Sequence, residues 1–259
     1  MTEDLITRIE NRVGYITFNR SAVLNSFTPD FLGMLISAVQ EFEKNDEVRA
    51  IVLTGAGKAF SSGGDKAFLN KLTKMTPMEI RSTVYTYFGG AAKTIKLCTK
   101  PTIAAVNGPA VGAGCEIAVA CDFRVVAREA FFCESWIDLG IIPPLGGMFL
   151  LPRLIGLGRA NDMVMRGVRV YGEEAAAIGL ANKVVDLESL ETAAREFSEE
   201  LARKAPTALS VAKEGLRRGL ESTMESEWGF NIYAQSMLLN GPDFEEAVQA
   251  MEQRRAPNF

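Results

Sequence analysis

The chain has 259 residues, with 28 lysines and arginines, 32 aspartates and glutamates, a formal net charge of −4 and no histidine. Without histidine, no catalytic triad or metal site that uses an imidazole can be built from one chain, so acid–base chemistry falls to carboxylates, Lys, Tyr, Cys or bound water. The slight negative charge and the lack of a basic arm or stripe argue against a nucleic acid partner.

Cysteine spacing and apolar runs bear on metal binding and location. The four cysteines are Cys98, Cys115, Cys121 and Cys133. They form no CxxC pair, so we expect no metal site, and their apolar neighbours indicate buried free thiols in a reducing compartment. The acidic start lacks the pattern of a signal peptide, and the most apolar stretch, 101–121, contains Asn107, Pro109 and Glu116, which argues against a membrane span. We therefore expect a cytoplasmic protein with no membrane partner.

The first half of the chain mixes strand and helix patterns. In chain order they predict two hairpin strands within 6–20, a helix from Pro29 capped by Thr28, a strand at 50–53, a Gly/Ser loop at 58–65, a helix at 78–97, a buried strand at 102–106, a short apolar helix at 112–120 and a strand at 123–127.

Strand patterns nearly vanish after Pro143-Pro144, apart from 183–185. Helical patterns follow at 188–203, 206–219, 223–238 and 243–252. This order predicts an α/β core domain over residues 1–190 and a helical C-terminal region over 191–259. The apolar stripes of these helices fit packing within the chain or against a partner subunit equally well.

The loop Lys58–Asp65 is made largely of small residues. Small residues let a ligand approach the backbone and leave N–H groups exposed as donors. A Gly-rich surface turn explains the pattern equally well. The spacing is not that of a phosphate loop of the Walker type.

A second loop, Val106–Gly112, leads from a buried strand into a helix of small residues. The start of such a helix offers free N–H groups and the positive end of a dipole. Glu116 lies one turn into this helix among apolar residues, where burial raises the pKa of a carboxyl group and suits it to general acid or base catalysis. The alternative is a structural glutamate that the dipole favours or that pairs with an arginine.

Together the two loops resemble the crotonase family, also called the enoyl-CoA hydratase/isomerase superfamily. The resemblance rests on AFSSGGD, PTIAAVNGPAVGAGCEIAVACD and LGIIPPLGGMFLLPRLIGLGRA, and it extends over nearly the whole chain. It implies a spiral of ββα units with a helical C-terminal region that builds a homotrimer or a dimer of trimers. It also implies an acyl-CoA substrate, no cofactor beyond that coenzyme A, and an oxyanion hole formed by the N–H groups of Gly64 and Ala113.

The resemblance makes Glu116 the acid/base, but the second glutamate of the family's hydratases falls on Trp136. Asp138 or Glu134 could replace it, or either could be structural. An extended segment would place 134, 136 and 138 on one side, whereas a helical one would turn Asp138 away. Trp136 is either a wall for a bulky acyl group or part of the core. Some isomerases and a dehalogenase of the family carry an Asp where Pro144 stands, so their catalytic carboxylate is missing.

Other positions are expected to line the coenzyme A or acyl site. They are Val23, Leu24, Ala59, Ser62, Asp65, Lys66, Gly112, Trp136, Leu139 and Pro144. Lys66 either reaches a coenzyme A phosphate or is solvated. The expected activity is isomerisation or atypical hydration of an enoyl-CoA with Glu116 as acid/base. The alternatives are a hydrolase or C–C lyase of a β-keto or cyclic acyl-CoA, and a catalytically weak homologue that binds coenzyme A.

Overall fold

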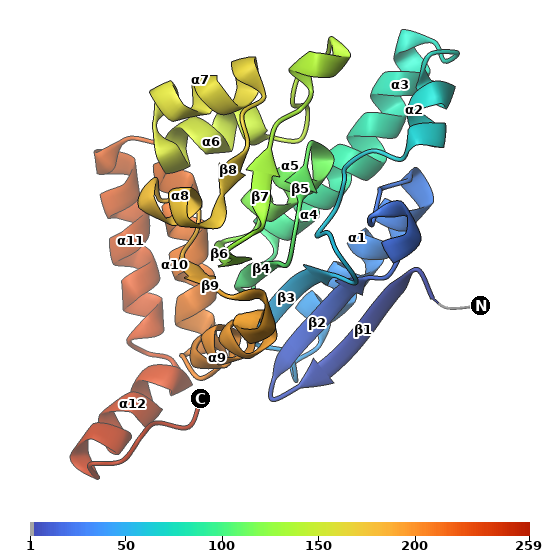
Figure 1. The fold of residues 1–259 in the computed structure, drawn as a ribbon. Helices are drawn as coiled ribbons and strands as arrows, with labels where there is room; N and C mark the ends of the chain where they lie inside the picture. Colours follow the sequence, from blue (N-terminus) through green and yellow to red (C-terminus); the bar gives the residue numbers. More distant parts are fainter. Residues whose placement is uncertain (1–2) are drawn as a thin grey trace.

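The computed structural model describes residues 3–259, and a six-stranded sheet lies at its centre (Figure 1). The strands, in spatial order, are β1 (Leu5–Glu10), β2 (Val13–Phe18), β3 (Ala50–Gly55), β4 (Thr102–Val106), β6 (Phe123–Ala127) and β9 (Lys183–Val185). Only β1 and β2 pair antiparallel; the other neighbours are parallel. The central strands are short apolar runs because helices cover both faces of a parallel sheet.

The predicted hairpin is confirmed and closes through a two-residue turn. Asn11 and Arg12 have φ angles of 50° and 64°. Positive φ at both central residues is the conformation that matches the twist of two antiparallel strands, and Asn adopts it readily.

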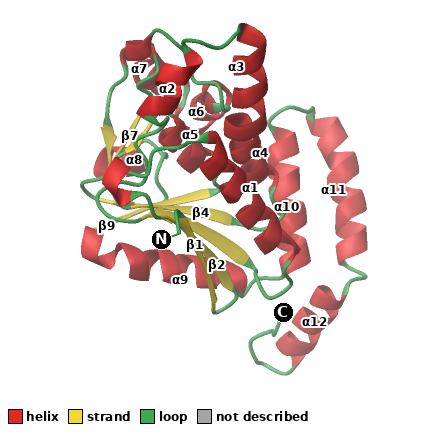
Figure 2. Cartoon of the chain, turned by 90° about the vertical axis from the view of Figure 1, so that its right-hand side faces the viewer, coloured by secondary structure: helices red, strands yellow, loops and turns green. Residues whose placement is uncertain are grey.

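Helices pack on both faces of the large sheet (Figure 2). On one face lie α1 (Pro29–Lys44) and α4 (Gly90–Leu97), and on the other lies α9 (Leu190–Ala202). The α1 helix begins as predicted, because the Thr28 hydroxyl accepts the N–H of Phe31 at 3.2 Å and Pro29 occupies the first helical position.

The predicted helix over 78–97 consists of three consecutive segments. They are α3 (Pro77–Thr83), a π-helical segment (Val84–Gly89) and α4. A π-helical turn widens a helix locally and is frequent at functional sites. The preceding short helix, α2 (Lys66–Leu72), was not predicted.

A second, three-stranded sheet lies beside the short helix α5 (Ala113–Ala120). Its strands are β5 (Ala110–Val111), β7 (Phe131–Cys133) and β8 (Val170–Tyr171), in that order. They were not predicted, because strands of two or three residues show no periodicity. Their importance is positional, since β5 leads into α5 and β7 runs beside β5.

The second half of the chain is mostly helical, as predicted. Its helices besides α9 are α6 (Gly147–Ile155), α7 (Leu157–Arg166), α8 (Gly172–Ala177), α10 (Pro206–Gly219), α11 (Met224–Leu238) and α12 (Pro242–Glu252). Three short 3-10 turns lie elsewhere along the chain, at Ser21–Val23, Ile137–Leu139 and Leu187–Ser189. Helix α9 packs on the core sheet, whereas α10 and α11 stand beside it and α12 projects beyond them (Figures 1 and 2). The domain boundary at 190 stays a prediction. No helix within residues 3–259 combines the length and apolarity needed to cross a bilayer.

Candidate active site

The two loops singled out in the sequence touch each other. Gly63 has a φ of +90°, and a Cβ added there would lie 2.7 Å from the carbonyl oxygen of Val111 and 3.4 Å from the nitrogen of Ala113. A Cβ added at Gly114 would lie 2.5 Å from the carbonyl oxygen of Ser61. Glycine at 63 therefore serves both the backbone conformation and the close approach of the loops.

Each loop has one backbone N–H group that takes no part in the hydrogen bonds of a helix or a strand ladder. Gly64 forms an isolated parallel bridge with Phe27. The bonds of this bridge use the carbonyl of Gly63, which accepts from Phe27 N–H at 2.7 Å, and the N–H of Asp65, which donates to Phe27 at 2.9 Å. The N–H of Gly64 is thus outside the ladder. Ala113 is the first residue of α5, where a helix has no internal acceptor for the N–H.

Glu116 is buried in the first turn of α5. Its Oε1 accepts the N–H groups of Leu145 at 2.9 Å and of Gly147 at 2.7 Å, and its buried Oε2 has no hydrogen-bond partner among the described residues. Burial raises the pKa of Glu116 well above its usual value and the nearby carboxyl of Glu134 adds to this, against the two backbone hydrogen bonds. The donors are backbone groups, so the arginine pairing considered from the sequence is not observed.

Glu134 is the second buried carboxyl group, just beyond the end of β7. Its Oε2 accepts the indole N–H of Trp136 at 2.8 Å, and its buried Oε1 has no partner among residues 3–259. Burial raises the pKa of Glu134 to about 7, partly offset by the neighbouring Cys115 thiol and by the hydrogen bond from Trp136. A Cβ on Gly147 would lie 2.9 Å from Oε1 of Glu116 and 3.2 Å from Oε1 of Glu134, so the two carboxyl groups flank one glycine.

Asp138 does not join this pair. Of the two conformations left open by the sequence, the structure has the helical one, because Ile137–Leu139 form a 3-10 turn directly after Trp136. Asp138 is exposed, and its Oδ2 lies 3.3 Å from where a Cβ of Gly167 would be, at the end of α7. Of the two carboxylates considered as replacements for the second glutamate, the structure brings only Glu134 to Glu116.

An apolar cavity of about 1030 Å³ opens beside Gly64. Trp136, Leu139 and Pro144, three of the positions predicted for the acyl or coenzyme A site, line it. Trp136 is buried, and its indole is 3.6 Å from where a Cβ of Gly112 would lie. The facing wall comes from α2 and the π-helical segment, which the sequence did not indicate as parts of the site; it includes Phe68, Leu69, Leu72, Val84 and Phe88.

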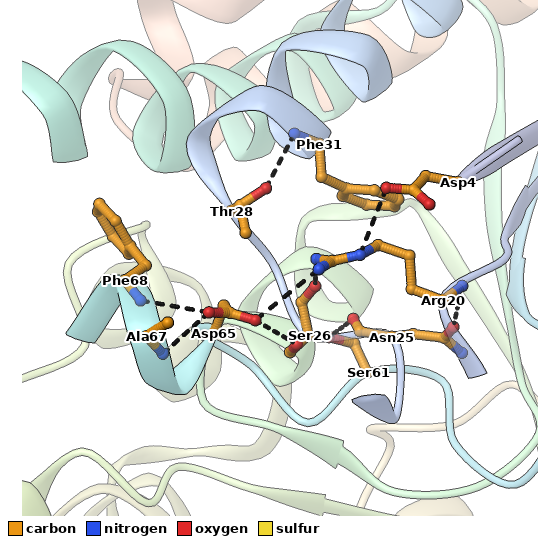
Figure 3. A network of polar contacts seen from close by, with 10 residues as sticks. All are labelled: Asp4, Arg20, Asn25, Ser26, Thr28, Phe31, Ser61, Asp65, Ala67 and Phe68. Carbon is orange, nitrogen blue, oxygen red and sulfur yellow. Dashed lines mark hydrogen bonds and ion pairs between the residues drawn. The ribbon is translucent and has the colours of Figure 1, made fainter. Parts of the chain in front are cut away.

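Asp65 is engaged in holding the first loop (Figure 3). Its Oδ1 caps α2 by accepting the N–H groups of Ala67 at 2.9 Å and Phe68 at 3.2 Å. Its Oδ2 accepts the Ser26 hydroxyl at 3.2 Å and lies 3.8 Å from the guanidinium of Arg20. The side chain therefore fixes the residue that follows Gly64 in the chain, and it is not among the cavity-lining residues.

The remaining predicted binding residues lie around the same loops. Val23 and Leu24 are exposed, and Ser62 donates its N–H to the carbonyl of Leu24 at 2.9 Å. Lys66 is exposed at the start of α2, and Ala59 is buried. Val23, Leu24 and Lys66 are thus open to a ligand, whereas Ala59 is not, because the whole residue is buried and its carbonyl accepts the side-chain amide of Asn25 at 2.8 Å. Their binding roles stay predictions.

Comparisons with known proteins show which proteins the chain is similar to. A family model described as enoyl-CoA hydratase/isomerase matches residues 8–259. The chain is 34% identical to a short-chain-enoyl-CoA hydratase of Clostridium acetobutylicum over 99% of its length and 97% of that protein. It is 30% identical to 1,2-epoxyphenylacetyl-CoA isomerase of Escherichia coli over 100% of its length and 99% of that protein. The crystal structure of an enoyl-CoA hydratase from Bacillus anthracis superposes with a TM-score of 0.93 at 32% identity, covering 99% of each chain, which confirms the expected fold.

Proposed function

Because this chain belongs to the enoyl-CoA hydratase/isomerase family and is an enzyme of that kind, we propose that it isomerises an enoyl-CoA, with Glu116 as both base and acid. The observation that carries the proposal is the state of Glu116. One oxygen is fixed by two backbone N–H groups, while the other is buried and has no partner in the described chain. A single carboxylate held in this way can remove a proton from one carbon and return it to another.

The two backbone donors supply the electrostatic part of the proposed step. The thioester oxygen accepts hydrogen bonds from the N–H groups of Gly64 and Ala113. Glu116 removes a proton from the γ carbon, and the C–H electron pair moves through the double bond to place negative charge on the thioester oxygen. Return of the proton to the α carbon restores the thioester with its double bond shifted. A fixed donor aimed at such an oxyanion contributes about 3 kcal/mol to the transition state.

The cavity beside Gly64 suits an apolar acyl group. Its volume of about 1030 Å³ and its mostly aliphatic and aromatic walls, with Arg81 as the one charged lining residue, favour an apolar acyl chain. The exposed Val23, Leu24 and Lys66 are proposed to contact the coenzyme A portion. The step needs proton transfer alone, so we propose no cofactor beyond the coenzyme A of the substrate.

A panel of enoyl-, dienoyl- and cyclic acyl-CoA thioesters with mass-analysed products tests the proposal. Isomerisation leaves the mass unchanged, hydration adds one water, and cleavage by a hydrolase or C–C lyase splits the thioester or its acyl group. The Glu116→Gln variant is expected to lose turnover by about 10²- to 10⁴-fold, because the amide cannot take up the proton. Full turnover by this variant on every accepted thioester would contradict the proposal.

Hydration is the second candidate, and the burial of Glu134 beside Glu116 favours it. Two carboxyl groups can hold and activate a water between them. Neither Glu134 nor Glu116 is among the residues that line the cavity, whereas Trp136 is, so a water held between the two acids would have to enter a buried position next to that lining. A product heavier by one water that disappears in Glu134→Gln would support this candidate.

A further inference from the structure

The two buried carboxyl groups come from different elements and meet at a third. Glu116 belongs to α5 and Glu134 follows β7, and both lie against Gly147 at the start of α6. A Cβ on Gly147 would crowd both carboxyl groups, since it would lie 2.9 Å from Oε1 of Glu116 and 3.2 Å from Oε1 of Glu134. The glycine thus permits the close approach of the two acids.

The hydrogen bonds of the two acids are unequal. Glu116 accepts two backbone N–H groups on one oxygen, and Glu134 accepts the indole N–H of Trp136. Trp136 also lines the cavity, whereas neither acid does. Trp136 therefore contacts the cavity and at the same time fixes the orientation of the Glu134 carboxyl group.

No buried cation of the described chain compensates the pair. The thiols beside it, Cys115 from α5 and Cys133 from β7, are buried, and burial raises the pKa of each, so both stay protonated and neutral and add no charge beside the acids. Arg169 and Asp138, the other charged groups that act on Cys133, are both exposed. The buried Arg124 donates to the carbonyls of Ala118 and Cys121, toward the far end of α5. Elements α5, β7 and α6 thus leave the two acids to interact mainly with each other.

We propose that Glu134 is a positioning residue whose carboxylate, fixed by the Trp136 indole, makes Glu116 a stronger base. This inference rests on the proposed role of Glu116 in proton transfer. Where Glu134 is ionised, its negative charge beside Glu116 disfavours the ionised form of Glu116, so Glu116 binds a proton more tightly. A carboxylate that binds its proton more tightly removes a proton from carbon more readily. Glu134 therefore acts through Glu116 and does not contact the substrate.

The direct test is a carbon-13 NMR titration of protein labelled at the glutamate side-chain carboxyl carbons. The Glu116 resonance is assigned by its loss in Glu116→Gln. In Glu134→Gln, which keeps an acceptor for the indole but removes the charge, we expect the pKa of Glu116 to fall by about one unit or more. The ascending limb of kcat/KM against pH should move to lower pH by the same amount, and the plateau rate should fall.

A second variant keeps the inference testable if Glu134→Gln fails to fold. Trp136→Phe preserves an aromatic wall but removes the only indole donor of Glu134, so Glu134 is more often neutral. We expect the Glu116 titration to move in the same direction by a smaller amount, and no further shift when both substitutions are combined. The matched control is Glu129→Gln, which alters an exposed carboxylate between β6 and β7 and should leave the Glu116 titration in place.

The outcomes separate this inference from the proposed function. An unmoved Glu116 titration in both folded variants overturns the role of Glu134, even if Glu116→Gln is inactive. Full activity of Glu116→Gln overturns the proposed function, whereas the NMR shift still reports on the coupling of the two acids. If Glu134→Gln lowers the rate but leaves both the limb and the titration unmoved, Glu134 has a merely structural role and the inference fails.

Discussion

At the scale of single residues, the buried pair predicts how stability depends on pH. Burial raises the pKa of Glu134 from 4.5 to about 7 in the folded state, so between these values the folded chain binds more protons than the unfolded chain. The free energy of unfolding therefore falls as pH rises through this interval. Glu134→Gln removes this penalty, so its stability relative to the unaltered chain should increase by about 3 kcal/mol between pH 4.5 and pH 8. Urea unfolding at both pH values measures the change, and an equal difference at both would contradict it.

Also at this scale, Gly114 reports on the contact between the two donor loops. Alanine is a better helix former than glycine, yet a Cβ at this position of α5 would lie 2.5 Å from the carbonyl oxygen of Ser61. We expect Gly114→Ala to lower stability by about 1–3 kcal/mol and to reduce kcat/KM, because the loops must move apart. The control is Gly158→Ala in α7, where nothing lies within 4 Å of the added Cβ. Thermal unfolding and turnover should be close to unaltered, or slightly improved, in the control.

At the scale of elements, α2 depends on its cap. Asp65 accepts the N–H groups of Ala67 and Phe68, and the helix it starts provides Phe68, Leu69 and Leu72 to the cavity wall. Asp65→Ala should lower stability by about 1 kcal/mol, and it should raise KM for the thioester because the wall loosens. Asp65→Asn keeps the cap and should retain most of both properties. Equal defects in the two variants would show that charge rather than capping matters.

The same elements show which parts of the fold could be predicted. Thr28 with Pro29 marked the start of α1, and sustained apolar periodicity marked the helices from α9 onward. In contrast, β5, β7 and β8 are too short to show a period. The π-helical segment Val84–Gly89 keeps an ordinary helical pattern in sequence, and only its packing reveals the wider turn. Asp65 is a favourable N-cap residue that could have indicated the start of α2, but the Gly/Ser composition of the preceding residues favoured a loop.

At the scale of the whole molecule, the site combines segments that are distant in the chain. The contact of the loops around Gly63 and Ala113 followed from motif resemblance, and the burial of Glu116 followed from its apolar neighbours. The pairing of Glu134 with Glu116 did not follow, because it depends on where β7 ends relative to α5 and on the small size of Gly147. No local pattern encodes such a three-element contact. An acid within an apolar run, as at Phe132-Cys133-Glu134, was the one available signal.

The C-terminal helices leave an apolar surface that we propose to be a subunit interface of a homotrimer or a dimer of trimers. Helices α10 and α11 contain no buried residue, and Trp228 and Ile232, four positions apart on α11, are 57% and 70% exposed. Exposed apolar patches of this kind mark association surfaces. Ile232→Asp should therefore reduce the particle mass measured by sedimentation velocity, whereas Glu225→Gln, an exposed carboxylate on the same helix, should leave it unaltered. A monomeric mass for the unaltered chain at micromolar concentration would contradict the proposal. An unchanged mass in both single variants, Ile232→Asp and Trp228→Asp, would also contradict it.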